Sequence, residues 1–149
     1  MVLTENNKTI ILLTNLRKNS REKLTTISKR TNIPISTLFD ELKKLEDNII
    51  LRKTILIDFS KLGYHVKAQV FLKVDENNKD KLKRHLICNE NVNTIYRVNN
   101  GWDFIIETAH KNIQDLDGLL ENISKNFIIQ NKQIHYLVED IKKEGILLN

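Results

Sequence analysis

The stretch IPISTLFDELKKLEDNIILRKTILI, residues 33–57, decides the fold of the first part of the chain. Apolar residues recur in it at spacings of four, three and four, which predicts one stripe along a helix formed by Leu38, Leu42, Leu45 and Ile49. Pro34, just ahead of this run, is a helix start signal. Residues 50–57 are then rich in β-branched side chains, and they predict two short strands that turn near Arg52 and Lys53.

Two shorter helical patterns precede this stretch. Apolar residues at helical spacing between Ile10 and Leu16 predict a first helix, and Leu24 and Ile27 predict a second. Three helices with a tight turn before the third, followed by a basic-tipped hairpin, are typical of a winged helix-turn-helix. The sequence therefore predicts a winged helix-turn-helix domain over residues 1–60.

The remainder of the chain alternates between strand and helix patterns. Residues 66–74 place an apolar side chain at every second position, which predicts a half-buried strand. Further strands are predicted over residues 92–98, 104–109 and 133–138, with helices around residues 82–86 and 116–123. The order strand, helix, strand, strand, helix, strand predicts a ferredoxin-like βαββαβ domain over residues 61–149, so the expected fold class is α+β.

One face of such a sheet carries no helix, and it needs another cover. Phe71 lies on the opposite face of the first strand from Val70 and Leu72, which points to partial burial on the open side. A second copy of the same sheet is the usual solution. We therefore expect a homodimer that forms sheet on sheet through the C-terminal domain.

The basic charge is concentrated in the first domain. Residues 1–60 hold 11 Lys and Arg against 7 Asp and Glu, whereas residues 61–149 hold 13 against 12. This asymmetry favours a polyanionic partner for the first domain. The side chains expected to meet double-stranded DNA lie at the start of the second helix, on the outer side of the third helix and at the hairpin tip, and they are Arg21, Ile35, Ser36, Thr37, Phe39, Asp40, Lys43, Lys44, Arg52 and Lys53.

These DNA-facing residues have different expected roles. Ser36 suits a base edge or a phosphate, Ile35 and Phe39 suit thymine methyl groups, and the lysines suit phosphates. The alternatives are that Phe39 packs into the domain core or a dimer contact, and that each basic side chain merely faces solvent.

The sequence lacks the residue patterns that several other classes of function require. Cys88 is the only cysteine and the four histidines are scattered, so we expect no metal and no cofactor. The sequence has no glycine-rich phosphate loop and no nucleophile beside a histidine, so we expect no enzyme. Apolar runs are far shorter than the about 20 residues of a membrane span, which favours a cytoplasmic, nucleoid-associated protein with no membrane partner.

Three segments resemble the leucine-responsive regulators, the Lrp/AsnC or feast/famine family. They are residues 19–50 (NSREKLTTISKRTNIPISTLFDELKKLEDNII), residues 56–74 and residues 96–107, and they follow the domain order of that family. The resemblance implies binding to near-palindromic promoter sites and a rear domain that dimerises, assembles into tetramers or octamers and in many members senses an amino acid. It also implies an effector site at the turn formed here by Asn99, Asn100, Gly101, Trp102 and Asp103.

The sequence departs from the family pattern at two places. A basic residue usually precedes the position of Leu42, but here Glu41 stands there beside Asp40. Two carboxylates near phosphates would weaken binding unless they point inward or pair with a lysine. In the turn, the family's glycine aligns with Asn100 and Gly101 comes one place later; asparagine tolerates the left-handed conformation, whereas Trp102 would reshape the pocket.

Two further hypotheses follow from these departures and from the domain order. One is a small-molecule sensor or interaction module whose DNA-binding head has decayed, and Asp40 and Glu41 motivate it. The other is an enzyme similar to the siroheme decarboxylases, which share this two-domain arrangement. Their characteristic His-Asn-Tyr stretch is absent, since the matching region reads Asn93, Thr94, Ile95, Tyr96.

Overall fold

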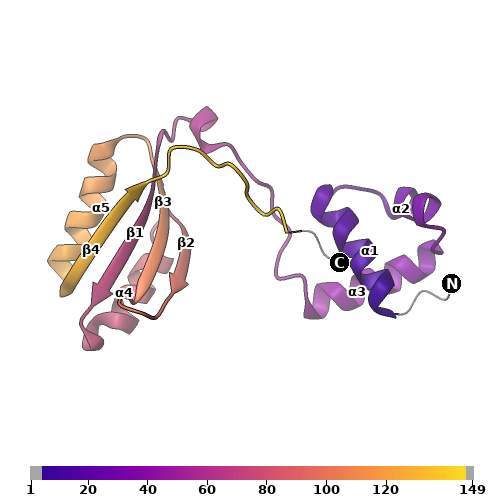
Figure 1. Cartoon of the computed structure of the whole chain (residues 1–149), viewed down its shortest axis with the longest axis horizontal. Coiled ribbons are helices and arrows are strands. Elements are labelled where there is room, and N and C mark those ends of the chain that lie inside the picture. Colours follow the sequence, from indigo (N-terminus) through magenta and orange to yellow (C-terminus); the bar gives the residue numbers. More distant parts are fainter. Residues whose placement is uncertain (1–4, 147–149) are drawn as a thin grey trace. The chain divides into compact units, whose positions relative to one another are not determined.

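The chain folds as two compact units, which we describe separately. The computed structural model describes residues 5–146, so residues 1–4 and 147–149 of the expected domains lie outside the described part. The N-terminal unit comprises the residues up to Leu56 together with those from Lys142 onward, and the C-terminal unit runs from Ile57 to Ile141. Figure 1 labels the helices and strands of both units.

The described residues of the N-terminal unit form three helices. They are α1 (Glu5–Lys18), α2 (Leu24–Thr31) and α3 (Ile35–Asn48). Their shared core consists of Leu12, Ile27, Ile33, Leu38 and Leu45, all buried. The turn between α2 and α3 is tight because Asn32 ends α2 in the left-handed conformation, with φ of 57°, and Pro34 stands immediately before α3. The predicted helix-turn-helix is confirmed.

The predicted wing is wrong. Residues 50–58 form no strand, and the side chains of residues 51–58 are exposed. Their β-branched composition favours extended backbone, but two arms of about three residues cannot bury an apolar face against each other, and isolated two-stranded hairpins are at best marginally stable. Arg52 and Lys53 therefore lie on an extended connection rather than at a hairpin tip.

Residues 142–146 belong to the N-terminal unit, and Glu144 contacts it directly. Arg17, in the last turn of α1, donates a hydrogen bond to the Glu144 carbonyl at 2.9 Å, and the two side chains form an ion pair at 3.6 Å. Both side chains are exposed, so the ion pair adds little stability.

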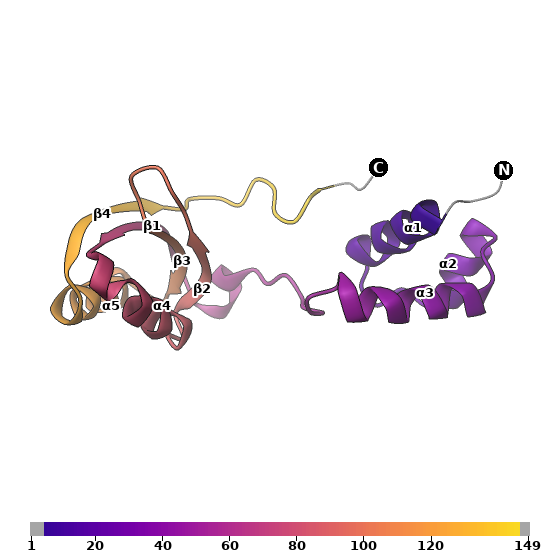
Figure 2. The same cartoon turned by 90° about the horizontal axis from the view of Figure 1, so that it is seen from below.

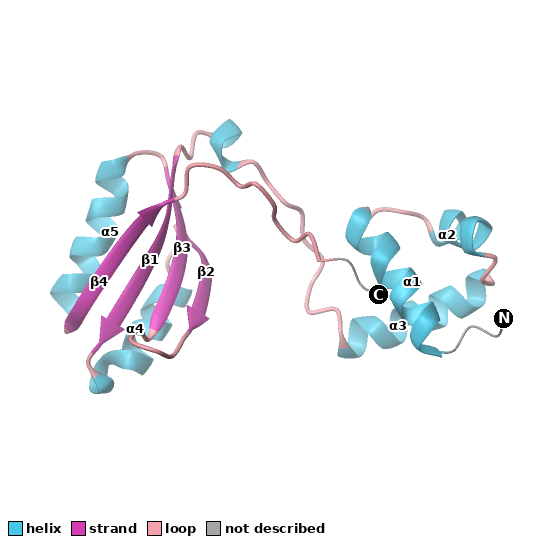
Figure 3. Cartoon of the chain, viewed as in Figure 1, coloured by secondary structure: helices cyan, strands magenta, loops and turns pink. Residues whose placement is uncertain are grey.

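The C-terminal unit has the expected order of elements. They are β1 (Val66–Val74), α4 (Lys79–Ile87), β2 (Val92–Arg97), β3 (Phe104–His110), α5 (Ile113–Asn126) and β4 (Ile129–Tyr136). The four strands pair antiparallel in the order β2-β3-β1-β4. Figure 3 shows the sheet and helices by type, and Figure 2 shows α4 and α5 on the same side of the sheet. The predicted ferredoxin-like arrangement is confirmed, although β4 begins before the expected residue 133.

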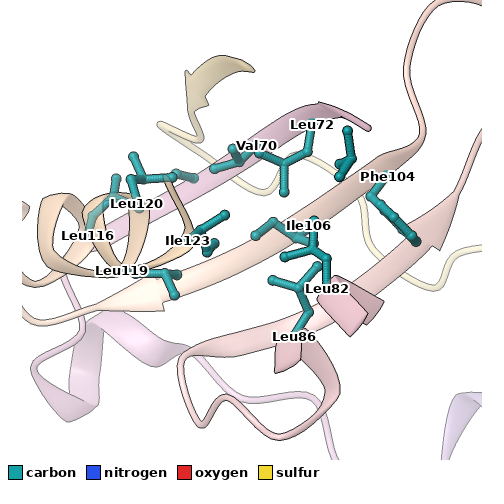
Figure 4. Packing of buried hydrophobic residues seen from close by; sticks show 12 residues of the cluster. Val70, Leu72, Leu82, Leu86, Phe104, Ile106, Leu116, Leu119, Leu120 and Ile123 are labelled. Carbon is teal, nitrogen blue, oxygen red and sulfur yellow. The ribbon is translucent and has the colours of Figure 1, made fainter. Parts of the chain in front are cut away.

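The core of this unit lies between the sheet and its two helices. Strand β1 contributes Val70 and Leu72, β3 contributes Phe104 and Ile106, and the helices meet them with Leu82, Leu86, Leu116, Leu119, Leu120 and Ile123 (Figure 4). Full burial of one such side chain contributes about 1.5–3 kcal/mol. This packing fixes the sheet, and with it the turn between β2 and β3.

Candidate DNA interface and effector turn

The outer side of α3 carries the residues that were expected to meet DNA. Ile35 is 48% exposed and Phe39 is 49% exposed, although both are large apolar side chains. Ser36, Asp40, Lys43 and Lys44 are also exposed, and Thr37 is half-buried. The opposite side of the helix buries Leu38 and Leu45 in the core. The helix is therefore anchored on one side and presents a mixed apolar, polar and basic surface on the other.

Phe39 does not pack into the core of the N-terminal unit. The ammonium group of Lys43 lies 5.0 Å from the centroid of the Phe39 ring, which is a cation–π distance. Lys43 stands one turn further along the same helix, so the contact holds both side chains on the outer surface. The core alternative for Phe39 is excluded.

Glu41 faces the interior of the N-terminal unit. Its carboxylate accepts a hydrogen bond from the Thr9 hydroxyl on α1, and the Glu41 side chain is half-buried. Asp40, its neighbour, is exposed on the outer surface. Only one of the two carboxylates therefore lies where it could meet a phosphate.

The basic residues expected beside α3 lie in irregular segments. Arg21 is exposed and precedes α2, which begins only at Leu24, so its expected place at the start of that helix is wrong. Its amide donates to the Asn19 side chain at 3.1 Å. Lys53 forms an ion pair with Glu46 of α3, and Arg52 is exposed.

The turn between β2 and β3 has the conformation expected for Asn-Gly. Asn100 has φ of 67° and Gly101 has φ of 100°. Both residues are exposed, as is Asn99. Asparagine and glycine are the residues that tolerate the left-handed region, so the shifted glycine leaves the turn intact. The backbone closes the turn with a hydrogen bond from the Val98 amide to the Asp103 carbonyl at 3.0 Å.

Asp103 is buried at the base of this turn. Its carboxylate accepts a hydrogen bond from the Val74 amide at 2.9 Å and forms ion pairs with Lys79 at 2.9 Å and Lys73 at 3.7 Å. Burial alone would raise the pKa of the Asp103 carboxyl, but the Val74 amide and the two ammonium groups outweigh it and hold the pKa below its usual value. Hydrogen bonds to Glu76 and Asp103 in turn raise the pKa of the Lys79 ammonium.

Asp103 is therefore a structural clamp between β1, α4 and the turn. Sequence reasoning missed both of its lysine partners because they belong to an earlier strand and helix, with no spacing pattern that joins them to the turn. This clamp leaves Asn99, Asn100, Gly101 and Trp102 as the outward part of the expected effector site.

Trp102 lies over the open face of the sheet. The Phe71 ring on β1 contacts Trp102 at 5.7 Å between centroids and His135 on β4 at 5.4 Å, both edge to face. Phe71 is half-buried by these neighbours, as expected, while Tyr96 on β2 remains 49% exposed. We call Phe71, Trp102, His135 and Tyr96 the aromatic group of the open face.

The geometry of residues 5–146 also bears on two other features, membrane spans and metal sites. Across residues 5–146, no helix combines the length and apolar character that crossing a bilayer requires. Within the same described part, no three of the His, Cys, Asp and Glu side chains gather closely enough to hold a metal ion.

Comparisons with known sequences point to transcription regulators. An HTH-type transcriptional regulator of Pyrococcus abyssi named FL11 is 28% identical over 109 residues, which cover 72% of this chain and 72% of that protein. A Pyrococcus furiosus protein named as an uncharacterized HTH-type transcriptional regulator is 23% identical over 134 residues, which cover 89% of this chain and 90% of the relative. No protein-family model matches the sequence.

Comparisons with solved structures confirm the fold over nearly the whole chain. A transcriptional regulator of Neisseria meningitidis in complex with L-Met matches with a TM-score of 0.88 at 17% identity, covering 98% of this chain and 97% of that one. AsnC of Escherichia coli matches with a TM-score of 0.85 at 19% identity, covering 95% and 97%. LrpC of Bacillus subtilis matches with a TM-score of 0.83 at 18% identity, covering 95% and 99%.

Proposed function

We propose that this chain, whose fold is that of the Lrp/AsnC regulators, is a DNA-binding transcription regulator that acts as a dimer or higher oligomer. The observation that carries the proposal is the outer surface of α3, where Ile35 and Phe39 stay exposed beside Lys43. Phe39 contacts Lys43 and lies one turn after Ile35, so the three side chains form one exposed patch, and such a patch is typical of an interaction site. The curated relatives, which are HTH-type transcriptional regulators, support the same proposal.

In this proposal α3 enters the major groove, which is about 12 Å wide. Ser36 contacts a base edge or a phosphate, Ile35 and Phe39 contact thymine methyl groups, and Asp40 accepts from a cytosine amino group. Lys43 and Lys44 contact phosphates, with Thr37 at the edge of the same surface. Arg21, Arg52 and Lys53 contact the backbone on either side, from irregular segments rather than from a wing.

The partner that we propose for the open face of the sheet is a second copy of the chain. The aromatic group of the open face presents apolar surface on the side that carries no helix. Leu51, Ile55 and Leu56 on the extended connection are also exposed. Burial of both surfaces would stabilise a homodimer that can assemble further into tetramers or octamers, and a two-fold axis would set two α3 helices about one helical turn of DNA apart.

Selection of bound duplexes from a random pool, followed by affinity measurements at two salt concentrations, tests this function. We expect an enriched near-palindrome whose half-sites are about 10 base pairs apart or a multiple of that distance. We also expect an affinity that falls steeply with salt, because phosphate contacts release counterions. A pool without any enriched motif, together with an affinity that salt does not change, would contradict the proposal.

The orientation of Glu41 argues against a decayed DNA-binding head. A carboxylate that accepts from Thr9 and is half-buried stands away from the phosphates that it was expected to repel. The remaining outward carboxylate, Asp40, is accompanied on the same surface by Lys43 and Lys44. No enzymatic step forms part of the proposal.

We further propose that a small effector, such as an amino acid, binds at the exposed part of the β2–β3 turn. The left-handed residues Asn100 and Gly101 and the side chains of Asn99 and Trp102 would form this site, with Asp103 holding it in place. Support comes from the Neisseria meningitidis regulator of the same fold, whose complex contains L-Met.

Thermal unfolding with each of the amino acids in turn tests the effector. A true effector at 100 times its Kd would add about 2.7 kcal/mol to the folded state and raise Tm by several degrees. Asn99→Ala should remove the rise, whereas Asn93→Ala, an exposed asparagine on β2, should leave it unchanged. A rise that both variants retain, or no rise with any amino acid, would count against this site.

A further inference from the structure

Helix α4 carries positive charge in a unit that is otherwise acidic. Residues 57–141 hold 11 Lys and Arg against 12 Asp and Glu, a net charge of −1. Six consecutive residues of α4, Lys79 to Arg84, contribute a net charge of +3, so the rest of the unit carries −4. Residues 61–74 also contribute +3, but each of their lysines, Lys61, Lys67 and Lys73, forms an ion pair with a carboxylate.

The cations of α4 project from the side of the helix that faces away from the sheet. Leu82 and Leu86 are fully buried against the sheet, and Lys81, Lys83 and Arg84 are exposed. At about 100° per residue, Arg84 lies near the middle of the exposed side, with Lys81 and Lys83 on its two flanks. Figure 2 shows this helix beside α5 on the helix-covered face of the sheet. We call Lys81, Lys83 and Arg84 the α4 basic face.

These three cations are not used by the fold. Among the described residues, none of them forms an ion pair with a carboxylate, whereas Lys79 on the same helix pairs with both Glu76 and Asp103. Asp80 lies in the first turn, where a negative charge suits the helix dipole, and it is the one acidic residue of the helix. The α4 basic face therefore keeps its charge available for a partner.

We propose that the α4 basic face binds the backbone phosphates of duplex DNA that flanks the site read by α3. The inference rests on the proposed function, because three exposed cations alone would hold a polyanion only weakly. Once α3 has bound its site, the same duplex is present near the C-terminal unit at an effective concentration in the millimolar range. Lysine and arginine on an open helix surface contact phosphates, so this contact adds affinity without adding sequence preference.

The experiment compares a short duplex, which contains only the selected site, with a long duplex that extends it by several helical turns on each side. The test variant is Lys81→Gln/Lys83→Gln/Arg84→Gln. The control variant is Lys111→Gln/Lys125→Gln/Lys132→Gln, which removes the same charge from other exposed positions of the same unit. Circular dichroism of both variants checks that the fold is retained.

The wild-type chain should bind the long duplex more tightly and with a steeper salt dependence than the short one. The test variant should equal the wild type on the short duplex. On the long duplex its salt slope should fall by about 2.7, since each of the three lost phosphate contacts changes the slope by about 0.9. Over a fourfold rise in salt, the affinity of the test variant for the long duplex should therefore fall roughly 40 times less than that of the wild type. The control variant should keep the wild-type difference between the two duplexes.

Each other outcome has a separate meaning. A wild-type chain that binds both duplexes with one slope, or equal losses in the test and control variants, would overturn the α4 contact and leave the regulator function standing. A wild-type chain that binds neither duplex would overturn both. If the test variant loses binding only to single-stranded RNA or to an acidic polypeptide, the face serves a different partner and the DNA inference is wrong.

Discussion

Replacement of Asp103 by asparagine should destabilise the C-terminal unit and should do so in a pH-dependent way. The carboxylate is buried, accepts from the Val74 amide at 2.9 Å and neutralises Lys79 at 2.9 Å. Asparagine keeps the shape and one acceptor oxygen, but it has no charge to offer the ammonium groups. The substitution therefore removes the electrostatic part of the clamp with little change in packing.

The size of the loss in unfolding free energy depends on how exposed the lysine partners of Asp103 are. Loss of one member of a fully buried ion pair costs about 3–5 kcal/mol, because the other charge stays buried and unpaired. Here the Lys79 and Lys73 side chains are 21% and 37% exposed, so water can solvate their ammonium groups again. A charge-assisted hydrogen bond contributes about 1.5–3 kcal/mol. We therefore expect Asp103→Asn to lower the free energy of unfolding by about 2 kcal/mol at pH 7.

The pH dependence gives a second, independent prediction. The pKa of Asp103 is lowered in the folded state, so its stabilising contribution is complete above the unfolded-state pKa of about 3.9 and is lost as the pH falls through the folded-state value. Below that value the wild-type carboxyl is protonated and resembles the amide. The difference in unfolding free energy between wild type and variant should therefore shrink from pH 5 to pH 2.

Urea unfolding followed by tryptophan fluorescence measures this difference in unfolding free energy for the C-terminal unit. Trp102 is the only tryptophan of the chain and lies next to Asp103, so its emission reports on the C-terminal unit. Asp117→Asn, which removes an exposed carboxylate of α5, is the matched control and should change the unfolding free energy by less than about 0.5 kcal/mol. A loss as small as the control, or one that is the same at pH 7 and pH 2, would refute the clamp.

Three further predictions concern the DNA surface and the two cores. Lys43→Ala should weaken binding to all duplexes and lower the salt slope by about 0.9, whereas Ser36→Ala should change the preferred base at one position; equal effects on selected and random DNA would reject these roles. Leu38→Ala should destabilise the N-terminal unit by about 2–5 kcal/mol in urea unfolding followed by helical circular dichroism, and a loss under 1 kcal/mol would contradict its place in the core. Burial lowers the pKa of His110, although the charge of Asp115 acts in the opposite direction, so protonation favours the unfolded chain. Tm should therefore fall as the pH drops below about 6.5, and His110→Leu should remove that fall. A variant with the same pH profile as the wild type would contradict this role of His110.

The parts of the fold that follow a strong period were predictable from sequence. The alternation along β1 and the apolar stripe of α3 each bury one face, and their burial patterns agree with the periods of a strand and a helix. The first and last residues of β4 were harder to predict because it is an edge strand. Most of its residues, such as Asn131 and Lys132, are polar and exposed. A pattern that depends on burial cannot mark a strand that buries little.

The errors and omissions arise where the outcome depends on contacts between distant segments. β-branched residues predicted a hairpin over residues 50–57, but strand propensity expresses a fit to a neighbouring strand, and this unit supplies none. The clamp at Asp103 joins a turn to the end of β1 and to the start of α4, so only the folded chain brings its charges together. Local sequence shows neither the lack of a neighbouring strand nor the contacts of Asp103 with β1 and α4.

Glu41 shows the opposite case, in which the sequence already held the answer. Adjacent residues of a helix differ by about 100° in direction, so Asp40 and Glu41 cannot both face the same partner. Glu41 is three residues after Leu38 and four before Leu45, the two buried residues of α3, and these spacings place it beside the apolar stripe and toward α1. The hydrogen bond from the Thr9 hydroxyl is the consequence of that position. A basic residue at position 41 would point in the same direction, so the absence of one there does not remove a phosphate contact from the outer surface of α3.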